Sequence, residues 1–292
     1  MTTESIVLHN GPLSFSGLSE GEGPLVLLLH GFPDTPTTFA KQLYALADAG
    51  YRAVAMTMRG YEPSSQPEDG DYHAIRMAED VVAWLNELGA ARAHLVGHDW
   101  GSNIAHAAAA LAPDRFASLT AIAVPHPLRF GEVYAASPEQ QARSAYILDF
   151  LQPNFEEAIS ANDFAYLANL WRTWSPGWDS STLFTEMKRH FSERGVARAA
   201  LEYYQQGFDT TSPAALATAA LFAMPIKIPT LGLCGAGDGC IGPDIFEAAM
   251  RSGDYPAGLR YVCIANAGHF VHTEAPERVN ALLLEWFAAN PA

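Results

Sequence analysis

The fold of this chain is decided by the stretch Gly97-His98-Asp99-Trp100-Gly101, in which an apolar strand turns sharply into a helix. Residues 93–96 before it have the apolar character of a buried strand, and the Ala-rich run 102–111 after it predicts a helix. Small residues two places before and two places after a central residue allow such a turn, which holds the central side chain out as a nucleophile. The sequence therefore predicts Asp99 as a nucleophile at a strand-to-helix turn.

A carboxylate at this position restricts the chemistry. An ionised carboxylate attacks without a base that first removes a proton. Attack on the carbonyl carbon of an ester or a peptide would give a reactive anhydride, so these substrates are disfavoured. Attack on a saturated carbon with a strained or good leaving group gives an ordinary ester, which water can cleave. The alternative interpretation is that Asp99 only caps the helix that follows it.

The composition excludes several classes of partner. The chain has 292 residues, of which 49% are hydrophobic, and its formal net charge of −15 argues against binding to nucleic acid or an anionic membrane surface. No apolar run approaches the ~18 residues that span a bilayer. The three cysteines have no metal-ligand spacing and indicate reduced thiols in a cytoplasmic protein. We expect a small, neutral, apolar substrate, and the sequence leaves open whether the protein is a homodimer.

Short apolar strands alternate with amphipathic helices along most of the chain, which predicts an α/β fold. The sheet is expected to be mostly parallel, with helices on both faces and an antiparallel pair, 6–9 and 13–17, at its start. The remaining expected strands are 25–29, 52–56, 94–96, 119–124, 230–234 and 260–264. The expected helices between them are 37–49, 74–88, 102–111, 245–251 and 276–289.

Residues 128–224 interrupt this alternation and predict an inserted helical cap. The segment lacks buried strand-like runs and reads as several helices, so residues 1–127 and 225–292 are expected to form the core domain. Ligands of open α/β sheets bind at the carboxyl ends of the strands, and we expect the cap to lie there. Its three tryptophans, Trp171, Trp174 and Trp178, are expected to build the cap interior or its contact with the core.

Two backbone N–H groups are candidates for an oxyanion hole. The segment His30-Gly31-Phe32-Pro33 follows the first buried strand, where one donor of such a hole is found, and the second donor is the residue after the nucleophile. The candidates are Phe32 and Trp100, which would stabilise the oxyanion that forms when water attacks an ester of Asp99. We expect His30 to support its loop rather than to act as a base.

Two segments near the C-terminal end complete a catalytic triad. Asp238 follows the expected strand 230–234, and His269 follows the expected strand 260–264. The chain order of nucleophile, acid and histidine is typical of this arrangement, with His269 as the base and Asp238 as the group that orients it. His272 is a rival for the base. Asp244 is an alternative acid, although its place before a helix is typical of an N-cap.

Four segments together resemble the epoxide hydrolases of the α/β-hydrolase fold. They are His30-Gly31-Phe32-Pro33-Asp34, Arg59-Gly60-Tyr61, the Asp99 turn at 97–101 and Gly268-His269-Phe270. The resemblance extends from about Gly23 to the end of the chain and is strongest in the core. It implies the α/β-hydrolase fold, with no metal and no cofactor in the reaction.

The resemblance also implies two cap tyrosines whose neutral O–H groups polarise the ring oxygen of the epoxide. Residues 146–153 resemble the first tyrosine segment of the family and residues 201–205 the second, which assigns these roles to Tyr146 and Tyr204. Together with Phe32 and Trp100, the two tyrosines are expected to contact the substrate.

The cap segments depart from the family pattern in two ways. Leu151 separates a Phe-Gln pair that is contiguous in the family, and Tyr203 stands directly beside Tyr204. Successive helical residues point about 100° apart, so only one of these two tyrosines can face Asp99. The alternative is that these tyrosines only pack in the protein interior.

The function expected from these residues is hydrolysis of an epoxide to a vicinal diol through a covalent ester on Asp99. A haloalkane dehalogenase would use the same triad of Asp99, His269 and Asp238, but it needs N–H donors for the halide. Phe32 stands where many such enzymes have an asparagine, and its side chain offers no donor. A third alternative, of another class, is a small-molecule receptor built on a hydrolase fold.

Overall fold

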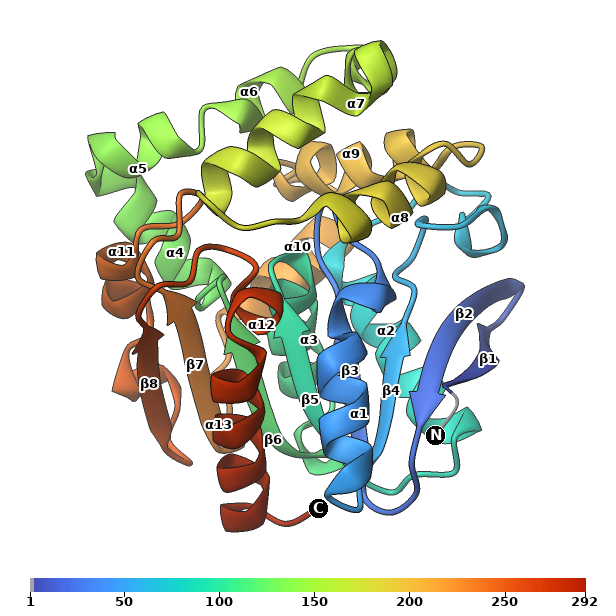
Figure 1. The fold of residues 1–292 in the computed structure, drawn as a ribbon, viewed down its shortest axis with the longest axis vertical. Coiled ribbons are helices and arrows are strands. Elements are labelled where there is room, and N and C mark those ends of the chain that lie inside the picture. Colours follow the sequence, from blue (N-terminus) through green and yellow to red (C-terminus); the bar gives the residue numbers. More distant parts are fainter. Residues whose placement is uncertain (1–2) are drawn as a thin grey trace.

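The computed structural model describes residues 3–292, which form an eight-stranded sheet with helices on both faces (Figure 1). The strand order is β1-β2-β4-β3-β5-β6-β7-β8; β2 is antiparallel to both of its neighbours and every other neighbouring pair is parallel. This confirms the predicted α/β fold. The strands are β1 (Glu4–Asn10), β2 (Leu13–Glu20), β3 (Leu25–Leu29), β4 (Arg52–Met56), β5 (Ala93–His98), β6 (Phe116–Ile122), β7 (Thr230–Gly235) and β8 (Leu259–Ile264).

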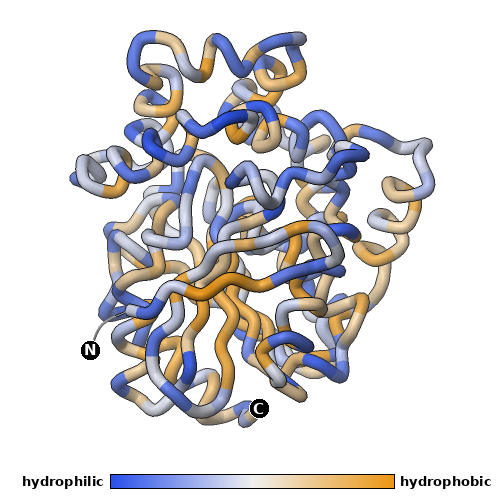
Figure 2. The backbone as a smooth tube through the Cα atoms, turned by 90° about the vertical axis from the view of Figure 1, so that its right-hand side faces the viewer, coloured by the Kyte–Doolittle hydropathy of each residue, from blue (hydrophilic) through white to orange (hydrophobic). Residues whose placement is uncertain are grey.

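The helices that cover the sheet pack on two separate apolar layers. In β3 the side chains of Leu25, Leu27 and Leu29 belong to one layer, and those of Val26 and Leu28 belong to the other, because side chains alternate along a strand. Both layers are buried, which explains why the central strands are apolar without alternation. Figure 2 shows this central hydrophobic region, with the more hydrophilic residues outside it.

The first layer lies under α2, α3 and α11, and the second under α1 and α13. The bounds of the core helices are α1 (Ala40–Asp48), α2 (Ala74–Glu87), α3 (Trp100–Leu111), α11 (Pro243–Ala249), α12 (Val271–Glu274) and α13 (Pro276–Ala289). Short 3₁₀ helices are η1 (Pro36–Phe39), η2 (Pro63–Ser65), η3 (Pro113–Arg115) and η4 (Ser252–Asp254). No helix within residues 3–292 is long and apolar enough to cross a membrane.

Further helices lie between β6 and β7, in the segment predicted as a cap. They are α4 (Pro127–Ala136), α5 (Pro138–Arg143), α6 (Tyr146–Phe150), α7 (Phe155–Trp174), α8 (Ser181–Phe191), α9 (Val196–Gly207) and α10 (Pro213–Phe222). Figure 1 shows α5 to α9 above the end of the sheet at which the strands β3, β5 and β7 end. We keep the name cap for residues 128–224, as a proposed division of the chain.

The observed elements differ from the predicted ones mainly at their ends. The strands 25–29 and 52–56 and the helix 276–289 have the predicted bounds. The expected helix 37–49 is divided into η1 and α1. The expected strand 119–124 instead ends at Ile122, because Ala123 adopts a left-handed conformation with φ of 64° that interrupts the strand.

Candidate active site

Asp99 lies at the turn between β5 and α3 in a backbone conformation that few residues adopt. Its φ of 52° and ψ of −121° are strained for a residue with a side chain, and such strain costs about 1–3 kcal/mol. A Cβ atom on Gly97 would clash with the carbonyl of Gly101, and one on Gly101 with the carbonyl of Leu29. The glycines are therefore required by the close approach of strand and helix.

The carboxylate of Asp99 does not serve as a helix cap. It occupies the N-cap position of α3, but it accepts no hydrogen bond from the N–H groups of the first turn of that helix, residues 100–103. Instead, Asp99 Oδ1 accepts a hydrogen bond of 2.7 Å from the N–H of Phe32. Asp99 is therefore not a simple N-cap of α3.

His269 lies between two carboxylates. Its Nδ1 is 3.0 Å from Asp238 Oδ2, and its Nε2 is 3.5 Å from Asp99 Oδ2. Asp238 is fixed in turn, because its Oδ1 accepts the N–H groups of Cys240 at 2.7 Å and Ile241 at 3.0 Å. The structure thus brings Asp99, His269 and Asp238 together, with Asp238 oriented toward the far nitrogen of the imidazole.

The neighbouring charges determine the protonation states of Asp99 and His269. Burial opposes ionisation of Asp99, but the hydrogen bond and positive charge of His269 and the N–H of Phe32 hold the pKa of this carboxyl below its usual range. Burial lowers the pKa of His269, but the carboxylates of Asp238 and Asp99 outweigh burial and raise this pKa to about 10. At neutral pH the site therefore holds an ionised Asp99 beside an imidazolium.

The structure distinguishes the two oxyanion-hole candidates. The N–H of Phe32 points at Asp99 Oδ1, as described above. The N–H of Trp100 makes no hydrogen bond to this carboxylate within residues 3–292. The side chain of Trp100 nevertheless lines the cavity in front of Asp99.

His30 supports the loop of Phe32, as expected. Its Nε2 accepts the N–H of Met58 at 3.1 Å, so Nδ1 carries the proton and donates to the carbonyl of Gly31 at 3.0 Å. The ring is fully buried, and burial lowers its pKa to about 4. A neutral imidazole with both nitrogens engaged links the loop after β3 to the loop after β4.

A cavity of about 290 Å³ opens in front of Asp99. Its lining is mostly apolar, with few polar groups, and includes Asp99, Trp100, Tyr146, Tyr204, Cys240 and Phe130. The rings of Tyr146 and Tyr204 lie 6.2 Å apart. Burial raises the pKa of both phenols well above the ordinary value, so both are neutral donors.

The hydroxyls of the two tyrosines differ in their partners. The hydroxyl of Tyr146 lies 3.5 Å from Cys240 Sγ. The hydroxyl of Tyr204 is buried and has no hydrogen-bond partner in the part of the chain that the structure describes. An unpartnered donor beside an ionised carboxylate is available to a ligand in the cavity.

Tyr203 points away from this cavity. Its hydroxyl donates a hydrogen bond of 2.6 Å to the carbonyl of Arg59, and its ring packs against Tyr61 and Tyr72. Of the adjacent pair, Tyr204 therefore faces Asp99 and Tyr203 is held in the protein interior.

The rival residues lie elsewhere. The ring of His272 stacks on Phe39 at 4.5 Å between ring centroids, and Asp238 orients His269 instead. The expectation that Asp244 is an N-cap is wrong: Gly242 holds the N-cap position of α11, and Asp244 lies in the first turn, where a carboxylate favours the helix dipole.

Several groups that hold His269 have no signal in the sequence. The N–H of His269 donates to both the carbonyl of Trp174 at 3.1 Å and Ser175 Oγ at 3.0 Å. Ser175 Oγ donates to Glu274 at 2.6 Å, and Glu274 also accepts the N–H of Gly268. Ser175 lies 94 positions before His269 in the chain, so only the three-dimensional structure reveals this contact.

The cap tryptophans lie at the contact between cap and core. The indole N–H of Trp171 donates to the carbonyl of Pro33 at 3.0 Å, and Trp178 stacks on Trp171. The ring of Trp174 lies 5.1 Å from that of His269 and 5.1 Å from that of Tyr146. Trp171 and Trp174 therefore join α7 to the loop after β3 and to the segment of His269.

Comparison with known proteins shows the family. The model of the alpha/beta hydrolase fold family matches residues 24–276. Epoxide hydrolase A of Mycobacterium tuberculosis is 31% identical over 97% of this chain and 97% of its own length. The AB hydrolase superfamily protein YfhM of Bacillus subtilis is 29% identical over 98% of this chain and 96% of its own length.

Solved structures agree with this relationship. The crystal structure of Epoxide Hydrolase A from Mycobacterium thermoresistibile has a TM-score of 0.81 and 27% identity, with 98% of both chains covered. The crystal structure of the epoxide hydrolase VrEH1 from Vigna radiata has a TM-score of 0.82 and 25% identity, again with 98% of both chains covered. The chain therefore belongs to the α/β-hydrolase fold family, in the group that contains the epoxide hydrolases.

Proposed function

We propose that this protein is an epoxide hydrolase that converts an epoxide into a vicinal diol through a hydroxyalkyl ester on Asp99. The observation that carries this proposal is the single cavity shared by an ionised carboxylate and two neutral phenols, Tyr146 and Tyr204. Ring opening needs a nucleophile on the carbon and a proton donor on the oxygen, and these groups supply both. The names of the relatives support the same substrate class.

In the first half-reaction an oxygen of Asp99 forms a bond to a ring carbon while the bond between that carbon and the ring oxygen breaks. The released alkoxide takes a proton from one of the two tyrosine hydroxyls. Because the cavity is mostly apolar, the hydrogen bonds to the developing oxyanion are strong there. The product is a hydroxyalkyl ester, and Asp99 no longer carries a charge.

The loss of the negative charge of Asp99 makes the second half-reaction possible. The carboxylate of Asp99 is one of the two groups that raise the pKa of His269, so formation of the ester lowers that pKa. The Nε2 proton then passes to the tyrosine phenolate left by ring opening, and Nε2 becomes a base. Asp238 keeps the imidazole in place through Nδ1. His269 then removes a proton from water, which attacks the carbonyl carbon of the ester.

The N–H of Phe32, which faces Asp99 Oδ1, stabilises the oxyanion of the tetrahedral intermediate, and the N–H of Trp100 is the proposed second donor. When this intermediate collapses, His269 returns its proton to the departing diol oxygen. The proton left on the new carboxyl of Asp99 passes to His269 and restores the resting pair of carboxylate and imidazolium. The sum is one epoxide and one water consumed for each diol.

Product analysis with matched substrates tests this function. The purified protein is incubated with epoxides and with terminal haloalkanes of equal chain length, and diol and halide are measured. The proposal expects diol without halide release. Halide release without diol would overturn it in favour of the dehalogenase, whose triad is the same. Ligand binding without turnover would favour the receptor alternative.

Two variants test the covalent scheme. Asp99→Asn is expected to abolish diol formation, and His269→Gln to accumulate an ester whose mass equals that of the chain plus the epoxide. Asp244→Asn is a matched control on α11, outside the triad, and is expected to turn over like the original protein. If His269→Gln stays folded but shows no mass increase after substrate addition, the proposed scheme is wrong.

A further inference from the structure

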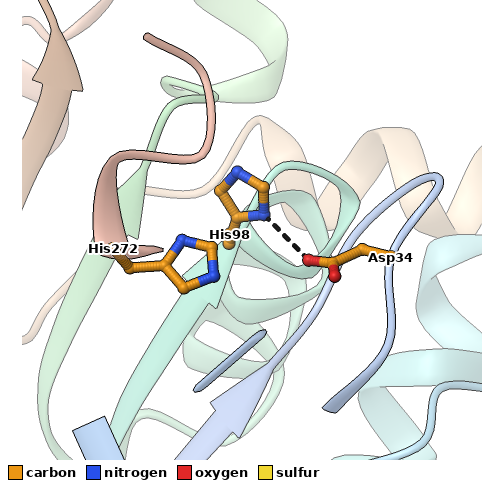
Figure 3. A group of neighbouring side chains, drawn as sticks. All are labelled: Asp34, His98 and His272. Carbon is orange, nitrogen blue, oxygen red and sulfur yellow. Dashed lines mark ion pairs between the residues drawn. The ribbon is translucent and has the colours of Figure 1, made fainter. Parts of the chain in front are cut away.

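A second group of titratable side chains lies behind the triad, and the proposed reaction does not use it. Asp34 comes from the loop after β3, His98 from the end of β5 and His272 from α12. All three side chains are fully buried, and one potential ligand atom from each lies within 4.8 Å of the others. Figure 3 shows the three side chains converging, with His98 between Asp34 and His272.

The hydrogen bonds of His98 leave a lone pair facing a carboxylate. His98 Nε2 lies 3.0 Å from the carbonyl of His269, which can only accept, so Nε2 carries the proton. In a neutral ring Nδ1 then holds a lone pair, and this atom lies 3.3 Å from Asp34 Oδ2. The contact is not aligned as a hydrogen bond. Two electron-rich atoms thus face one another in the protein interior.

Asp34 has the partners expected of an ionised carboxylate. Its Oδ1 accepts the N–H of Thr35 at 2.6 Å, and its Oδ2 accepts the hydroxyl of Thr38 at 3.2 Å. A buried carboxylate beside a lone pair is unfavourable unless a positive charge lies between them.

His272 adds a third electron-rich atom. Neither of its ring nitrogens has a hydrogen-bond partner within residues 3–292, although its ring centroid lies only 4.5 Å from that of His98. Buried polar atoms are normally paired. A proton on His98 Nδ1 would pair His98 with Asp34 but would leave both nitrogens of His272 unpaired. A metal cation can instead accept one ligand atom from each of the three residues.

We propose that Asp34, His98 and His272 form a binding site for a divalent transition metal of the Zn²⁺ type. Two imidazole nitrogens and one carboxylate oxygen are a ligand set that suits this class of ion. Two ligands about 2.1 Å from a tetrahedral ion lie about 3.4 Å apart, which matches the 3.3 Å between His98 Nδ1 and Asp34 Oδ2. The ring of His272 lies farther away and moves toward the ion, and water completes the coordination.

Such an ion has a structural role. It joins three segments that are distant in sequence, and each carries a group of the candidate active site: the loop with Phe32, the strand that leads to Asp99 and the segment of His269. The site does not depend on the proposed reaction, and its test needs no substrate.

Metal binding to the full chain is measured directly. The protein is treated with a chelator, desalted, exposed to Zn²⁺ and desalted again. Bound zinc is then determined by inductively coupled plasma mass spectrometry. We expect one Zn²⁺ per chain. At 100 times its Kd, Zn²⁺ shifts the folding equilibrium about 100-fold, which raises the Tm by about 5 °C. Absence of retained zinc together with an unchanged Tm would overturn the proposal.

Variants assign the binding to this site. Asp34→Asn and His272→Phe, which retains the aromatic stacking on Phe39, are expected to lose the bound zinc. His9→Gln is the matched control, because His9 is an exposed histidine paired with Glu87 on the surface. Zinc that persists in the first two variants, or is lost in His9→Gln, would show binding elsewhere.

Co²⁺ provides a measurement on the unmutated protein, for the case that a variant does not fold. Four-coordinate Co²⁺ in a nitrogen and oxygen site absorbs strongly in the visible region, whereas hydrated six-coordinate Co²⁺ at a surface absorbs weakly. The proposal expects the strong bands at one equivalent, and their loss when Zn²⁺ is added. Weak bands alone would contradict it.

Discussion

The charge on Asp99 and the proton on His269 depend on one another. Their side chains lie 3.5 Å apart, and each shifts the pKa of the other in favour of the charged form. Burial opposes both charges, so the pair depends on mutual attraction together with Asp238 on the far side. This coupling lets one step of the proposed reaction prepare the next.

The first prediction concerns the pKa of His269. Asp99→Asn removes one of the two carboxylates that raise this pKa to about 10, so the pKa falls, as followed by nuclear magnetic resonance of the imidazole during a pH titration. Because the folded-state pKa exceeds the unfolded value of about 6.5, the contribution of His269 to stability is full below that pH. It is lost as the pH rises toward 10, and in Asp99→Asn it is lost at lower pH.

The second prediction separates the adjacent tyrosines. Tyr204→Phe removes a cavity hydroxyl and is expected to lower kcat for epoxides by about 10²-fold or more, the usual contribution of a proton donor. Tyr203→Phe removes the hydrogen bond to the carbonyl of Arg59 and is expected to lower the Tm with little change in kcat. Equal losses of kcat in the two variants would contradict the assignment of Tyr204.

At the scale of elements, a buried ion pair joins α2 to the loop after β4. Arg59 donates two hydrogen bonds of 2.7 Å to Asp80, and Asp80 also accepts one of 2.8 Å from Asn10 of β1. The carbonyl of Arg59 accepts the hydroxyl of Tyr203 from α9. Through its side chain and its carbonyl, Arg59 thus connects the Asp80 side chain of α2, which also binds β1, with α9 of the proposed cap.

The third prediction follows from this pair. Asp80→Ala leaves the guanidinium of Arg59 buried without its counter-charge, which is expected to lower the free energy of unfolding by about 3–5 kcal/mol. Urea unfolding measures this change. Glu285→Ala breaks the exposed pair with Arg260, which has a similar distance of 2.7 Å, and is expected to cost at most about 1 kcal/mol. Similar losses of unfolding free energy in Asp80→Ala and Glu285→Ala would mean that burial does not determine how much an ion pair contributes to stability.

The limits of prediction from the sequence also appear at this scale. The sequence predicts elements that have a local signal well: the apolar run 25–29 is a strand with these bounds, and helix 276–289 begins at a proline. The glycines around Asp99 encode the sharp turn directly. Groups that act through distant contacts, such as Ser175 on His269, leave no local pattern, because a serine after a helix has many other roles.

At the scale of the whole molecule, the contact between cap and core contains part of the candidate site. Trp171 of α7 binds the carbonyl of Pro33, directly beside Phe32. Arg143 donates to the carbonyl of Asp238 at 2.9 Å, and Gln140 donates to the carbonyl of Cys240 at 2.8 Å. The helices of the proposed cap therefore hold the loops that carry Phe32 and Asp238.

The fourth prediction tests this contact. Trp171→Phe keeps an aromatic ring but leaves the buried carbonyl of Pro33 unpaired, which is expected to cost about 1–3 kcal/mol of stability and to lower kcat/KM. Trp178→Phe is the control, because Trp178 stacks on Trp171 but donates no hydrogen bond within residues 3–292. Thermal unfolding and steady-state kinetics compare the two. An unchanged kcat/KM in Trp171→Phe would show that the hydrogen bond between Trp171 and Pro33 does not affect the reaction.

The carbonyl of Trp174 has a consequence for protein engineering. It accepts the N–H groups of both His269 and Gly239, so the backbone of α7 contacts the segment of His269 and the segment that follows Asp238 at one point. Because the acceptor is a main-chain atom, the side chain at 174 can change without loss of these bonds, whereas a change in helix length or register cannot be tolerated. Chimeras that exchange caps between relatives to alter selectivity must therefore keep the end of this helix in place.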